Sequence, residues 1–83
     1  MITKEIFKYL IQTISPETLQ QEIDSPGDYL LLEMHTFNVG SYGTIKSLDY
    51  DEEEERRAND NGDLFMDKDD FLRLCEELEV FEY

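Results

Sequence analysis

A chain of 83 residues with a net charge of −14 has room for one small domain and is expected to repel nucleic acid and anionic membranes. It has no apolar run near the roughly 18 residues of a transmembrane helix, and its single cysteine, Cys75, excludes an internal disulfide and a thiolate zinc site. A hydrophobic content of 40% nevertheless suffices for a small core. The first residues resemble no signal peptide, so we expect a cytoplasmic protein.

Two short helices are predicted at the start of the chain. Thr3 is a suitable cap for a helix over Lys4–Ile14, in which apolar residues recur at helical spacing. Ser15 followed by proline marks the start of a second helix over Pro16–Ile23. Helix pairs of this kind occur in helix-turn-helix DNA-binding domains, but the second helix carries no cation, so we do not expect this pair to bind DNA.

The segment Tyr29–Phe37 is the best candidate for a strand and is expected to be central in the sheet. Leu30, Leu32 and Met34 alternate with more polar residues, which predicts one face toward the core. The glycines of Asn38–Gly43 predict a hairpin loop.

A second strand is expected over Thr44–Tyr50, and a turn at Asn59–Gly62 precedes a third, short strand over Asp63–Met66. The second strand is a candidate neighbour for the third. The sequence leaves Glu52–Ala58 open between a helical turn and a solvated loop, because acids at i and i+4 repel one another in a helix.

The last helix is predicted over Lys68–Val80, with Asp67 as its cap. The element order is then α-α-β-β-β-α, which favours an α+β domain: a three-stranded antiparallel sheet with helices packed on one face. The apolar stripe of the last helix is expected to comprise Phe71, Leu74, Cys75, Leu78 and Phe81.

Negative charge is concentrated in the C-terminal part of the chain. Residues 49–83 hold fifteen of the twenty-one carboxylates and four cations, a net charge of −11, against −3 in the first 48 residues. The acids form a nearly continuous run and a helical face. The candidate partner-binding residues are therefore Asp49, Tyr50, Asp51, Glu52, Glu53, Glu54 and Glu55 in the run and Asp69, Asp70, Glu76 and Glu77 on the helix.

The segment Asn59–Leu64 resembles part of an EF-hand calcium loop, but the register is unfavourable. With Gly62 at the sixth loop position, the first position is Arg57 and the twelfth is Lys68. Calcium requires carboxylate oxygens at both places, so we expect a turn with no metal and no other cofactor.

No residue set is typical of an enzyme. His35 is the only imidazole, and Cys75 lies on an apolar stripe where a thiol acts as a small hydrophobe. A Cys–His nucleophilic pair needs nearby positive charge to stabilise the thiolate, and the surrounding acids do the reverse. We therefore expect a protein without catalytic residues.

The acidic segment allows three interpretations: a solvated surface without a role, an acidic handle for a basic protein, or mimicry of nucleic acid. Duplex DNA presents about one charge per 3.4 Å of axis per strand, and helical carboxylates at i and i+4 lie about 6 Å apart along the axis. A helix face with an acidic loop could therefore imitate a row of phosphates and occupy a basic groove.

In size, charge and architecture the whole chain resembles small acidic inhibitors of phages and mobile elements: DNA-mimic anti-restriction proteins, uracil-DNA glycosylase inhibitors and anti-CRISPR proteins. The resemblance includes no shared motif. It implies that the protein blocks a nuclease or CRISPR effector at its nucleic-acid site, although anti-CRISPR proteins also act allosterically or by inducing dimers. The alternative hypothesis is an adaptor or immunity-type module that binds a basic protein outside nucleic-acid biology.

Overall fold

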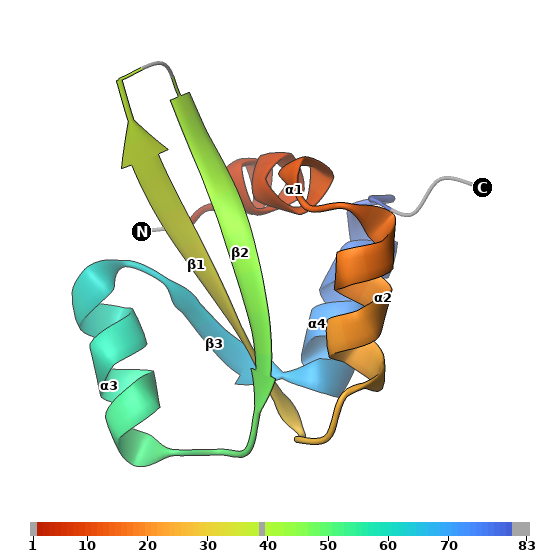
Figure 1. Cartoon of the computed structure of the whole chain (residues 1–83), viewed down its shortest axis with the longest axis vertical. Coiled ribbons are helices and arrows are strands. Elements are labelled where there is room, and N and C mark those ends of the chain that lie inside the picture. Colours follow the sequence, from red (N-terminus) through yellow and green to blue (C-terminus); the bar gives the residue numbers. More distant parts are fainter. Residues whose placement is uncertain (1, 39, 81–83) are drawn as a thin grey trace.

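The computed structural model describes residues 2–38 and 40–80, which form four helices and one three-stranded antiparallel sheet (Figure 1). The expected α+β class is confirmed, and one further helix, α3, lies between the second and third strands. In chain order the elements are α1 (Lys4–Thr13), α2 (Pro16–Asp24), β1 (Tyr29–Phe37), β2 (Gly40–Leu48), α3 (Glu52–Asn61), β3 (Leu64–Asp67) and α4 (Lys68–Glu77).

The strand β1 is central, as predicted, and the order in the sheet is β2-β1-β3. It pairs with β2 along its whole length and with β3 only over Tyr29–Leu32. The expectation that the third strand could pair with the second is wrong. Between these two strands the chain passes through α3, and it re-enters the sheet on the other side of β1 (Figure 1).

One face of the sheet carries the main core. Because side chains alternate along a strand, Leu30 and Leu32 point to the same face, and both are almost completely buried. Helices α1, α2 and α4 cover this face, and the rings of Phe7 and Phe71 meet edge to face with centroids 5.5 Å apart. Met34, Leu74 and Leu78 pack at the margin of this core, while Phe81 lies outside the described residues.

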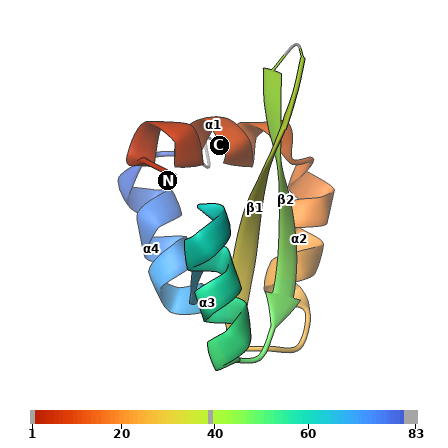
Figure 2. The same cartoon turned by 90° about the vertical axis from the view of Figure 1, so that its left-hand side faces the viewer.

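The helix α3 covers the opposite face of the sheet, so the prediction that all helices pack on one face is wrong (Figures 1 and 2). Leu31 points away from the main core, yet it is only 8% exposed, and Ala58 of α3 is 2% exposed. Both residues line the same narrow hollow between α3 and the strands. The position of α3 has a reason in the sequence, because Leu31 is an apolar residue on the more polar face of β1 and is shielded from water when a helix packs on that face.

Strand β2 begins at Gly40, earlier than predicted, so Gly43 lies within the strand instead of in the hairpin loop. A Cβ atom at Gly43 would lie 3.0 Å from the Cβ of Leu10, and the missing side chain therefore lets α1 approach the strand. The Gly43 amide donates to the hydroxyl of Thr13 at 3.0 Å, and the Ser47 amide donates to the carboxylate of Glu22 at 3.0 Å. Side chains from α1 and α2 thus occupy the outer edge of β2, which protects it from pairing with another strand.

Candidate partner-binding surface

The acidic run forms the first turn of a well-defined helix. The Asp51 side chain caps α3 by accepting from the amides of Glu53 and Glu54, at 2.8 and 3.3 Å. Acids in a first turn also face the positive end of the helix dipole. At the other end, Gly62 adopts the left-handed conformation with φ 77°, and the amide of Asp63 donates to the Ala58 carbonyl. These contributions offset the repulsion between neighbouring acids and explain why the open segment Glu52–Ala58 is helical.

Two arginines on α3 divide its carboxylates into two groups. Arg56 lies 3.4 Å from Glu53, and Arg57 lies within 3.5 Å of both Glu53 and Glu54. All three contacts span one helical turn, where exposed pairs contribute about 0.3–0.5 kcal/mol each. Glu53 and Glu54 are therefore partly neutralised by the helix itself.

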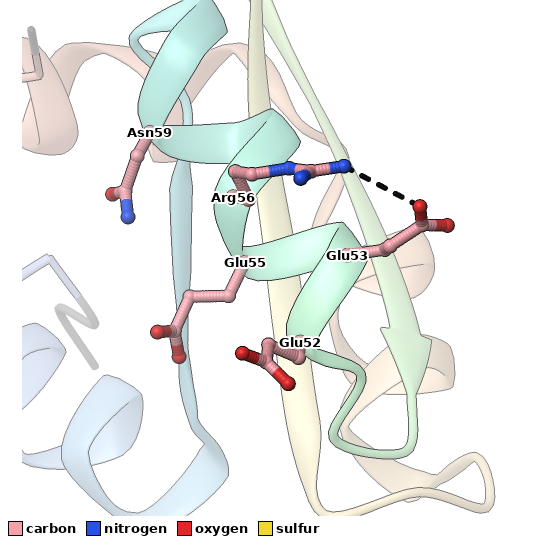
Figure 3. A pocket seen from close by; sticks show the side chains of 5 residues that line it. All are labelled: Glu52, Glu53, Glu55, Arg56 and Asn59. Atoms are coloured by element: carbon pink, nitrogen blue, oxygen red, sulfur yellow. Dashed lines mark hydrogen bonds and ion pairs between the residues drawn. The ribbon is translucent and has the colours of Figure 1, made fainter.

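Four other carboxylates belong to the run. Asp51 caps the helix, and Asp49, Glu52 and Glu55 have no ion pair within residues 2–38 and 40–80. We call these three residues the α3 acidic surface. Figure 3 shows Glu52 and Glu55 extending to one side of α3, beside a shallow open hollow, while Glu53 extends to the other side toward Arg56. The helix thus separates paired charge from charge available to a partner.

Tyr50 lies next to this surface and is 51% exposed. Its ring packs at 5.2 Å from the ring of Tyr29 and at 6.1 Å from that of Phe65. The negative charge of Glu55, followed by partial desolvation and the charge of Glu52, raises the pKa of the Tyr50 phenol. The two carboxylates thus disfavour the loss of the Tyr50 phenol proton.

The second predicted group of acids lies on α4, across the sheet from α3 (Figure 1). Asp69, Asp70, Glu76 and Glu77 are all exposed, as expected. Asp70 lies 3.4 Å from Arg73, and Glu77 lies 2.9 Å from Lys4. The structure therefore does not bring the two acidic groups into one continuous row, and each has to be considered as a separate surface.

Some acids have structural contacts that account for their presence. Asp51 and Asp67 cap α3 and α4. Asp63 accepts a hydrogen bond at 3.1 Å from the amide of Met34, just beyond the end of the β1–β3 pairing. These contacts compensate backbone amides that lack a partner in the helix or sheet. Among the predicted site residues, Asp51 is thus the one with a clear role in folding.

His35 and Cys75 do not meet. His35 faces the α3 side of the sheet, where it stacks on Tyr42 and contacts the Thr44 hydroxyl at 2.9 Å. Cys75 lies in the core on the other side, fully buried, and burial raises the pKa of its thiol to about 12. A thiol with so high a pKa remains protonated near neutral pH and is a poor nucleophile.

The Asn59–Asp63 segment forms the end of α3 and its cap, as described above. Within the described part of the chain, no group of three or more His, Cys, Asp or Glu side chains is arranged to hold a metal ion. Nor does any helix in that part have the length and apolar composition needed to cross a bilayer.

Tyr29 and Phe65 are the residues of this site that the sequence analysis did not identify. Both lie on the α3 face of the sheet, on β1 and β3, and their rings stack 5.0 Å apart. Alternation in β1 places Tyr29 on that face, but the support from Phe65 depends on the β1–β3 pairing. No family model, curated protein or solved structure matches the chain.

Proposed function

We propose that the protein is a cytoplasmic, non-enzymatic inhibitor of the anti-CRISPR or DNA-mimic kind, which would act in the host cell if it is encoded by a phage. The α3 acidic surface would occupy the basic nucleic-acid-binding site of a nuclease or CRISPR effector. The observation that carries the proposal is the separation of charge along the acidic run: the arginines of α3 pair with Glu53 and Glu54, while Asp49, Glu52 and Glu55 form no ion pair within the described residues.

The spacing of these charges supports the proposal. Glu52 and Glu55 are three residues apart on one helix, which places them about 4.5 Å apart along its axis. Phosphates of one DNA strand are spaced by about 3.4 Å along the duplex axis, so a groove that binds phosphates can accept both carboxylates. Because the helix is capped at both ends, little conformational entropy should be lost when they bind.

The α4 acids are the second candidate contact with the partner, and fewer observations support them than support the α3 acidic surface. Glu77 and Asp70 already have cationic neighbours in Lys4 and Arg73. The large exposed hydrophobic residue on α4 is Leu72, at 36% exposure, and no aromatic residue there matches Tyr50. Interface hot spots are enriched in Tyr and Arg, which favours α3 as the principal surface.

The first experiment is capture of the partner from the native host by the tagged protein, followed by mass spectrometry. The captured partner is then tested for simultaneous binding of the protein and of its own DNA or RNA. We expect competition, and we expect affinity to fall about tenfold or more between roughly 50 and 200 mM salt. Simultaneous binding with salt-insensitive affinity would contradict the proposal.

The alternative function is an acidic adaptor or immunity-type module that binds a basic protein unrelated to nucleic acids. The same uncompensated carboxylates support it, because they attract any basic surface. The competition assay distinguishes the two functions: a captured partner without nucleic-acid affinity would favour the adaptor.

A further inference from the structure

The ring of Tyr50 is accessible to a partner and is also held in place by two neighbouring aromatic rings. About half of the residue is exposed, and its ring packs against Tyr29 and Phe65. Those two rings are in turn stacked and belong to paired strands. A ring held in this way loses little freedom when a second planar group stacks on it, which is the property that favours aromatic anchors in interfaces.

The surroundings of this ring are anionic. Glu52 and Glu55 lie in the first turn of α3, shortly after Tyr50 in the chain, and neither forms an ion pair with an arginine of α3. The charges of both raise the pKa of the Tyr50 phenol. The two carboxylates extend to the same side of the helix (Figure 3). An aromatic face and two acids therefore lie together at the N-terminal end of α3, a combination that the α4 surface does not have among the described residues.

We propose that Tyr50, Glu52 and Glu55 form a binding site for an arginine side chain of the partner, with the guanidinium stacked on the Tyr50 ring and its N–H groups donating to the carboxylates. This inference rests on the proposed function, and it specifies which basic residue that function requires. The site selects arginine over lysine. A guanidinium is planar, stacks on aromatic rings and donates through a fixed fork, whereas a lysine ammonium is a compact and strongly hydrated charge.

The test uses hexa-arginine and hexalysine peptides as probes, because they have the same length and charge. Each peptide is titrated into the isotopically labelled protein at about 50 mM salt, where screening of exposed charges is weak, and binding is followed by NMR. We expect hexa-arginine to bind about threefold more tightly than hexalysine, as a partly exposed cation–π contact allows. The largest shifts should be at the rings of Tyr50, Tyr29 and Phe65.

Three variants distinguish the contribution of the Tyr50 ring to peptide binding from that of nonspecific charge attraction. In Tyr50→Leu the preference for hexa-arginine should decrease, because the apolar contact and the two carboxylates remain and the aromatic face is lost. In Tyr50→Phe the arginine preference should persist, since the ring remains. Tyr9→Leu is the matched control. Tyr9 is also half exposed, but its hydroxyl donates to the carbonyl of Ser41, away from the proposed site, so this substitution should leave the arginine preference unchanged.

Equal binding of the two peptides to the unaltered protein would overturn the inference, and so would an arginine preference that is as large in Tyr50→Leu as in the unaltered protein. These results are independent of the proposed function, because no nucleic acid or partner takes part. Arginine preference without competition against the partner's nucleic acid would overturn the proposed inhibitor alone. Competition without arginine preference would overturn the arginine site alone.

Discussion

Helices α3 and α4 are both ten residues long and acidic at their start, yet they are held in place by different means. The α4 helix buries Phe71 and Cys75 in the main core, whereas α3 buries only Ala58. Caps, the helix dipole and ion pairs must supply more of the stability of α3. The comparison shows that a helix with one buried residue can be held in place mainly by its caps and charges.

The same contrast applies to the acids themselves. On α3 the arginines pair with Glu53 and Glu54 and form no ion pair with Glu52 or Glu55. On α4, Asp70 and Glu77 are paired with Arg73 and Lys4, and the large exposed hydrophobic residue is Leu72. Each of the following predictions substitutes a residue in or next to only one of the two helices.

The largest effect on stability is expected on α4. Phe71→Ala removes a ring that is 1% exposed and packs on Phe7, and it should cost roughly 3–5 kcal/mol, enough to unfold so small a domain. Leu72→Ala, on the exposed side of the same helix, should change stability by about 0.5 kcal/mol or less. Urea denaturation followed by circular dichroism measures both. Equal effects of the two substitutions would place the core elsewhere.

A smaller effect is expected at the cap of α3. Asp51→Ala removes the acceptor of two backbone hydrogen bonds and should cost about 0.5–2 kcal/mol. Asp60→Ala, near the C-terminal end of the same helix, removes one negative charge and no capping contact, so it should be neutral or slightly stabilising. If Asp51→Ala left the midpoint of urea unfolding unchanged, the cap would not be needed to hold the acidic run in a helix.

The smallest expected effect is a change in the pKa of Tyr50. Glu55→Gln should lower the pKa of Tyr50 toward its ordinary value near 10, because the Glu55 charge is the main cause of the upward shift. The raised pKa favours the neutral phenol in the folded state, so its contribution to stability is present below about pH 10 and is lost as the pH rises further. NMR titration of the tyrosine ring carbons reports the change. An unaltered Tyr50 pKa in Glu55→Gln would show that the carboxylate does not act on the phenol.

Much of the fold could be predicted because local signals agree with the tertiary structure. The caps Thr3, Ser15 and Asp67 begin helices where expected, and the alternation of Leu30 and Leu32 identifies the core face of a central strand. The position of α3 could not be predicted in the same way. Its sequence has one buried residue, Ala58, and its formation depends on several small contributions that oppose charge repulsion.

The candidate site could be predicted in composition but not in arrangement. The charge distribution indicates which segment is acidic, and Tyr50 stands out within it. Which acids the arginines neutralise depends on the formation of the helix. The packing of Tyr50 beside Phe65 depends on strand pairing between distant segments. Only the structure separates the α3 acids from those of α4.

The most direct measurement compares charge reversal on the two helices. Asp49→Lys, Glu52→Lys and Glu55→Lys are combined in one variant, and Asp69→Lys, Asp70→Lys and Glu76→Lys in another, with circular dichroism to confirm that both fold. Affinity for the captured partner is then measured by titration calorimetry. We expect the α3 variant to lose about a hundredfold, from three exposed charge contacts of roughly 1 kcal/mol each, and the α4 variant to lose only a few-fold. An equal or larger loss in the α4 variant would contradict the assignment of binding to α3.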